Sequence, residues 1–142
     1  MVQPVLISIA GTLRQDGEEQ KLELVTEGSY CYEPGLVSFS YEESQMTGLE
    51  GVISTFTVEH ERTATLRRTG KLNSCIEFSM QGVHESLYDI GFAAMMLRVR
   101  TLSLTALFNE HGGVLDLEYA IELENTTCGV NAYHIEVRPQ LS

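Results

Sequence analysis

The chain has 142 residues, a net charge of −11, 43% hydrophobic residues and 20% charged residues. This length and balance suit one domain with an apolar core and argue against disorder. The charge also argues against a nucleic-acid partner, whose phosphates are bound by Lys and Arg, and against docking on anionic lipid. We therefore expect a single domain over residues 1–142, with neither nucleic acid nor membrane as a partner.

Alternating apolar and polar residues predict β-strands along most of the chain, because successive side chains of a strand face opposite sides. The expected strands cover residues 2–13, 18–32, 36–44, 52–58, 63–69, 73–80, 83–90, 92–101, 102–108, 114–124 and 131–138. Asp16-Gly17 is a strong hairpin signal, and Gly28 predicts a bulge or a sharp bend inside its strand. Residues 92–101 include good helix formers, but the alternation of Leu97, Val99 and Thr101 favours a strand.

About ten strands with short turns and no convincing helix predict an all-β sandwich or barrel. The succession of antiparallel hairpins favours an up-and-down barrel of about 8–10 strands, which removes exposed sheet edges by closing on itself. An interior of this size holds either packed side chains or one small ligand.

One strand carries charge on its inward face. Val37, Phe39, Tyr41 and Glu43 share a face, and its apolar members indicate that this face points inward. A carboxylate there needs a partner, because a lone buried charge is costly. Arg68 stands on the inward face of another strand, so we expect Glu43 and Arg68 to meet inside the barrel in a charge-assisted contact.

Two interpretations of this pair remain open. In one, the pair is a polar anchor in a ligand cavity, where a free edge of the Arg68 guanidinium binds a small carboxylate or phosphate. In the other, it is a structural ion pair in a filled barrel. Tyr30, Tyr41, Tyr88 and Tyr119 also fall on inward positions, where tyrosines line a pocket or complete an ordinary core.

Several short motifs follow one another along the chain: Thr26-Glu27-Gly28-Ser29-Tyr30, Tyr41-Glu42-Glu43-Ser44 with Gly48 and Gly51, Arg68-Thr69-Gly70, and Tyr88 with Gly91. In this order and spacing they resemble the YwiB-like family, small bacterial proteins of unknown function with a calycin (lipocalin-like) β-barrel. The resemblance covers nearly the whole chain and implies a fold, with no established activity to carry over. The family tends to have Tyr-x-Thr where this chain has Tyr88-Asp89-Ile90, so a role for that threonine hydroxyl is in doubt here.

The remaining candidates for chemistry are weak. Cys31, Cys75 and Cys128 are odd in number and widely spaced, which predicts buried free thiols in a reducing cytoplasm rather than disulfides or a zinc site. The N-terminal apolar run is too short for a signal peptide, and no run approaches the roughly 20 apolar residues of a spanning helix. The four histidines lack metal-ligand spacing, and no nucleophile elbow, dinucleotide or phosphate-loop motif is present. We therefore expect no metal, no cofactor and no catalytic residues.

The sequence favours a non-enzymatic cytoplasmic protein that binds a small anionic or amphipathic ligand inside its barrel. The expected binding residues are Arg68, Glu43, Tyr41, Tyr30 and Tyr88. The alternative is a filled-barrel structural or interaction protein that works through its outer surface or an oligomer interface, and the sequence leaves a dimer open. An enzyme is less favoured than either, because it would require a strongly perturbed group in an accessible cleft.

Overall fold

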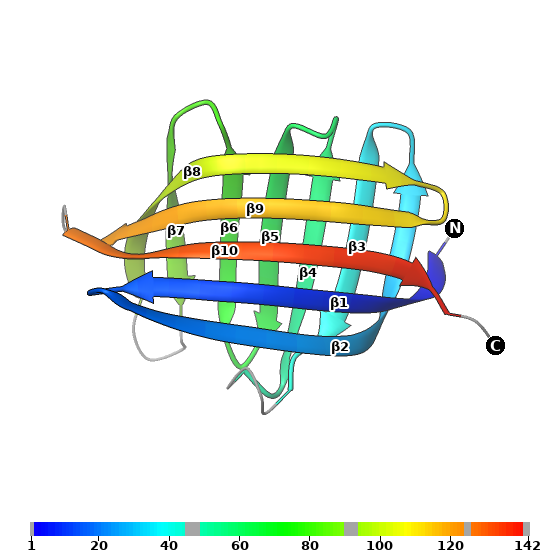
Figure 1. Ribbon diagram of the computed structural model, residues 1–142, viewed down its shortest axis with the longest axis horizontal. Helices are drawn as coiled ribbons and strands as arrows, with labels where there is room; N and C mark the ends of the chain where they lie inside the picture. The colour runs from blue at the N-terminus through cyan, green and yellow to red at the C-terminus, as the bar shows by residue number, and fades with distance from the viewer. Residues whose placement is uncertain (1, 45–48, 90–93, 124–125, 141–142) are drawn as a thin grey trace.

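The computed structural model describes residues 2–44, 49–89, 94–123 and 126–140. These residues form ten antiparallel strands: β1 (Val2–Gln15), β2 (Glu18–Glu33), β3 (Leu36–Glu42), β4 (Val52–Glu59), β5 (Thr63–Gly70), β6 (Asn73–Ser79), β7 (Val83–Asp89), β8 (Ala94–Asn109), β9 (Gly112–Leu123) and β10 (Thr126–Pro139). Each strand pairs with its neighbours in sequence, and β1 pairs with β10 to close the barrel. The expected up-and-down β-barrel is therefore confirmed (Figure 1).

The barrel is flattened into two layers whose strands cross (Figure 1). One layer contains β8, β9, β10, β1 and β2, and the other contains β3 to β7. The layers join at two corners, where residues 28–33 of β2 pair with β3 and residues 94–100 of β8 pair with β7. Among the described residues, the first ten residues of β2, 18–27, pair with β1 alone. One stretch of β2 therefore borders the space between the layers.

Gly28 stands at the first corner, where β2 begins to pair with β3. A Cβ atom at this position would lie 2.4 Å from the carbonyl oxygen of Ser40 and 2.5 Å from Cδ1 of Ile7. The pairing runs through Gly28 without a register shift on either side. The sequence predicted a bulge or a sharp bend at this residue, and the continuous register shows that there is no bulge. Glycine is needed here because it permits the close approach of two backbones at the corner.

The turn between β1 and β2 has the predicted form. Asp16 and Gly17 have φ angles of 53° and 81°. Positive φ at both central residues is what a two-residue type I′ hairpin requires, and Asp-Gly is among the pairs that adopt it most readily. Local turn chemistry therefore sets the register of the two longest neighbouring strands.

Residues 94–109 form one long strand, where the sequence predicted two adjoining segments. Leu97, Val99 and Thr101 are buried, as their alternation predicted. The register then shifts between Thr101 and Ser103, so Leu102 is exposed and Ala106 becomes an inward residue. This bulge reverses the inward phase of the strand, which explains why a single alternation does not fit the whole segment.

Aromatic rings fill part of the interior. Phe39 stacks on Phe56 and contacts Phe108, which in turn stacks on Tyr30. The Tyr30 hydroxyl donates a hydrogen bond of 2.6 Å to the carbonyl oxygen of Asn109, which satisfies its buried polar atom. This part of the barrel is packed core.

Two further expectations from the sequence concern the cysteines and the absence of a membrane-spanning helix. Cys75 is exposed and Cys31 is half-buried, so the expectation of buried thiols is wrong for Cys75, which occupies an outward position of β6. Both are free thiols, and the side chain of Cys128 lies outside the described residues. Among the residues that the structure describes, no helix is long and apolar enough to cross a membrane.

Candidate functional site

A cavity of about 380 Å³ lies between the two layers of the barrel. Its walls come from β1, β2 and β10 on one side and from β3, β4 and β5 on the other. The lining residues are Ile9, Gly11, Thr12, Leu13, Gln20, Lys21, Leu22, Leu24, Tyr41, Glu43, Leu49, Phe56, Leu66, Arg68, Asn131, Tyr133 and Ile135. Its size matches that of small-molecule sites, which are mostly apolar with a few polar groups.

Strand register places a row of polar residues across one layer. Tyr41 of β3 pairs with Ser54 of β4, Ser54 pairs with Arg68 of β5, Arg68 pairs with Ser74 of β6, and Ser74 pairs with Tyr88 of β7. Residues directly opposite one another on neighbouring strands project to the same face. The next row toward the other end of these strands is apolar, so the polar groups are concentrated at one end of the interior.

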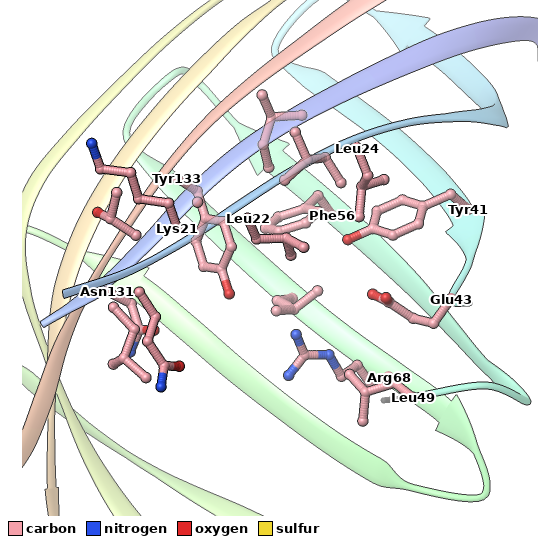
Figure 2. A pocket seen from close by; sticks show the side chains of 17 residues that line it. Lys21, Leu22, Leu24, Tyr41, Glu43, Leu49, Phe56, Arg68, Asn131 and Tyr133 are labelled. Atoms are coloured by element: carbon pink, nitrogen blue, oxygen red, sulfur yellow. The ribbon is translucent and has the colours of Figure 1, made fainter. Parts of the chain in front are cut away.

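Glu43 lies just beyond this row and points into the cavity (Figure 2). The backbone N–H of Glu43 bonds to the carbonyl oxygen of Val52, so the β3–β4 ladder continues to this residue. Glu43 is only 6% exposed, which confirms its predicted inward position. The Ser54 hydroxyl donates a hydrogen bond of 2.8 Å to Glu43 Oε1, while Oε2 is buried without a hydrogen-bond partner.

Arg68 enters the same cavity from β5 but does not form the expected ion pair with Glu43. Among the described residues, the salt bridges do not include this pair, and Arg68 Nε is buried without a partner. The reason is topological: β4 lies between β3 and β5, and its residue Ser54 supplies the hydrogen bond to Glu43. Both charged groups therefore face the cavity without neutralising each other directly.

Tyr41 also lines the cavity, and its hydroxyl points toward the space shared with Glu43 and Arg68 (Figure 2). Burial, followed by the nearby negative charge of Glu43, raises the pKa of Tyr41 well above its ordinary value. Arg68 opposes this shift, which indicates that its charge is also close. Tyr41 is therefore a neutral hydrogen-bond donor at ordinary pH.

The other tyrosines proposed for the site behave differently. Tyr30 is fully buried in the aromatic core and does not line the cavity. Tyr88 occupies the strand position opposite Ser74, while its side chain lies outside the described residues. Tyr119 is buried next to Phe78 and Tyr133, and burial raises its pKa. The cavity thus joins three of the five expected binding residues: Arg68, Glu43 and Tyr41.

A family model described as "Domain of unknown function (DUF1934)" matches residues 7–135 of the chain. The chain belongs to this family. The crystal structure of the ywiB protein from Bacillus subtilis is similar with a TM-score of 0.86 and 18% sequence identity, over 99% of this chain and 94% of that chain. The two matches confirm the resemblance to the YwiB-like family, and the structural match shows a shared fold. No curated protein matches the chain by sequence.

Several polar residues at this site were not proposed from the sequence, including Thr12, Gln20 and Lys21 of the cavity lining. Tyr133 and Asn131 line the cavity from β10, and Ser54 holds Glu43 in place. The alternation predicted that Tyr133 faces inward without assigning it a role. Ser54 carried a recognisable signal, because it is a polar residue between Val52 and Phe56 on an inward face. Asn131 carried the same kind of signal at the start of its predicted strand.

Outside the cavity, a polar cluster lies on the outer face of β9 and β10. His134 contacts Asp116 through Nδ1 and Glu136 through Nε2, the latter at 3.0 Å. These two carboxylates raise the pKa of His134. In the described ranges, no three His, Cys, Asp or Glu side chains converge where they could hold a metal ion.

Proposed function

We propose that this protein binds a small amphipathic organic molecule in the barrel cavity, with an anionic group of that molecule held by Arg68. The observation that carries the proposal is a cavity of about 380 Å³ whose lining includes Glu43 and Arg68, two inward charged side chains that form no salt bridge with each other. A barrel with a completely filled interior would have no space of this size. The cavity therefore favours ligand binding over the filled-barrel alternative.

Arg68 suits an anionic group for a chemical reason. Its guanidinium is always charged and has only donors, arranged to match a carboxylate or phosphate. Arg68 Nε has no partner within the described part of the protein, although a buried donor without an acceptor costs free energy. An anion in the cavity would supply that acceptor.

The rest of the cavity suits an apolar body. Leu22 and Leu24 of β2 lie close to Phe56 of β4 (Figure 2), and Leu66 of β5 also lines the cavity. A ligand that fills this space would remove its own apolar surface from water at roughly 25 cal/mol per Å². The combination of an apolar body and one charged end supports an amphipathic ligand.

The proposal keeps the protein non-enzymatic and in the cytoplasm, as the sequence suggests. The net charge of −11 also supports the expectation that nucleic acid is not a partner.

Native mass spectrometry of protein purified gently from its own host would test the proposal. We expect an additional small-molecule mass that is lost on denaturation, absent from Arg68→Met and retained in Arg67→Met, where the neighbouring arginine is exposed. Arg68→Met should cost less than the about 3–5 kcal/mol typical of breaking a buried ion pair, because no such pair exists here. An apo mass that is unchanged after incubation with metabolite extract of that host would refute the proposal.

A further inference from the structure

We infer that the ligand is a zwitterion, of the class of apolar α-amino acids, whose carboxylate contacts Arg68 and whose ammonium group contacts Glu43. This inference rests on the proposed function and adds the second charged group. The proposed function needs only Arg68 and an anion. The ammonium group is inferred from Glu43, whose Oε2 has no hydrogen-bond partner in the described part of the chain.

One carboxylate oxygen of Glu43 accepts a hydrogen bond, and the other has no hydrogen-bond partner among the described residues. Ser54 donates to Oε1, and the buried Oε2 has no hydrogen-bond partner. The side chain is more than nine-tenths buried and lines the cavity beside the Tyr41 hydroxyl, so a ligand in the cavity can supply the partner that Oε2 lacks. An ionised carboxylate only accepts hydrogen bonds, and its best partner is a charged donor such as an ammonium group.

Arg68 presents the opposite requirement in the same space. Its guanidinium only donates, and its Nε lacks an acceptor. Figure 2 shows the polar ends of Tyr41, Glu43, Arg68 and Tyr133 pointing toward a common region of the cavity. Glu43 and Arg68, which form no salt bridge with each other, therefore border one binding space.

The two inward charged groups, Glu43 and Arg68, select among ligand classes, since Lys21 lines the cavity from an exposed position of β2. Tyr41 stays protonated because burial and the charge of Glu43 raise its pKa, so it adds no negative charge. A purely anionic ligand would place a second negative charge beside Glu43, and a purely cationic ligand would leave Arg68 unsatisfied. A zwitterion supplies the acceptor and the donor together, since its two charged groups are complementary to those of the site.

The apolar wall then specifies the remainder of the ligand. Leu22, Leu24 and Phe56 line the part of the cavity beyond the charged groups, so an amino acid with an apolar side chain is favoured over a polar one.

Isothermal titration calorimetry with three matched probes would test this inference. The probes are L-phenylalanine, N-acetyl-L-phenylalanine, which lacks the ammonium group, and L-phenylalanine methyl ester, which lacks the carboxylate; L-leucine and its two derivatives form a second set. We expect the free amino acids to bind and each derivative to lose about 10- to 100-fold in affinity, the range for a charge-assisted hydrogen bond. The inference is overturned if N-acetylation leaves the affinity unchanged, or if neither amino acid binds.

Glu43→Gln gives a second readout. Glutamine keeps an oxygen that can accept from Ser54 but removes the charge, so the free amino acids should lose about tenfold or more in affinity while the N-acetyl derivatives lose nothing. Glu42→Gln is the matched control, because Glu42 is the adjacent, exposed residue of β3. Equal effects of the two substitutions would contradict the inference, as would equal losses for free and N-acetylated probes.

The two proposals can fail separately. If native mass spectrometry finds a bound molecule that depends on Arg68 and carries no amino group, the zwitterion is wrong and the proposed function stands. If no molecule is bound and no probe binds, both are wrong. The probe series uses the wild-type protein, so the result does not depend on whether a Glu43 variant folds.

Discussion

The hydrogen bond from Ser54 to Glu43 should be a measurable part of the stability of this barrel. Ser54 is fully buried, and its hydroxyl donates a hydrogen bond of 2.8 Å to Glu43 Oε1. Ser54→Ala would remove this hydrogen bond from the buried carboxylate. Hydrogen bonds to charged groups contribute about 1.5–3 kcal/mol, so we expect a loss of that size in the free energy of unfolding.

A double-mutant cycle separates this hydrogen bond from other effects of the substitution. In a Glu43→Met background the acceptor is already gone, so Ser54→Ala should cost less than about 0.5 kcal/mol, or stabilise the protein by removing an unsatisfied hydroxyl. The assay is equilibrium unfolding in urea for the wild type, both single variants and the double variant. The reasoning is refuted if Ser54→Ala costs the same in both backgrounds.

Three further predictions concern the fold and its pH dependence. Gly28→Ala would place a Cβ atom 2.4 Å from the Ser40 carbonyl oxygen and should cost at least about 1–3 kcal/mol in urea unfolding; an unchanged midpoint would contradict the tight corner. Burial raises the pKa of Tyr30 from 10.0 to about 12, so its proton is lost first from the unfolded chain and stability should fall as pH rises from 10 to 12. Tyr30→Phe should flatten this decline in unfolding midpoints measured across the same range, and an equally steep decline would count against it. The pKa of His134 is raised above 6.5, first by Asp116, so its stabilising contribution is complete below pH 6.5 and lost as pH rises through the folded pKa. In an NMR titration Asp116→Asn should lower the pKa of His134, and an unshifted titration would exclude Asp116 as the cause.

Much of the fold follows from local patterns in the sequence. Alternation assigned Val37, Phe39, Tyr41 and Glu43 to the interior, and all four are buried. Asp16-Gly17 specified its hairpin. These features depend on a residue and its near neighbours along the chain, because the period of a strand and the type of a turn are local properties. A local error occurred where the bulge before Ser103 reversed the phase of β8, since a bulge changes the alternation without a distinctive residue.

The contacts within the site depend on how different strands are placed relative to one another. The sequence placed Glu43 and Arg68 on inward faces, and both line the cavity. It could not show that Ser54 takes the place of Arg68 as the partner of Glu43, or that Tyr30 belongs to the packed core.

The sequence by itself determined that this protein is built from antiparallel strands with charge on an inward face, because side-chain alternation is a property of each strand alone. Only the tertiary structure decided that part of the interior is a cavity and that Glu43 and Arg68 line it without a salt bridge between them. The physical reason is that a cavity is what remains after the side chains of β1, β2 and β10 meet those of β3, β4 and β5. That volume is fixed by strand register and by closure of the barrel between β1 and β10, which no single segment encodes.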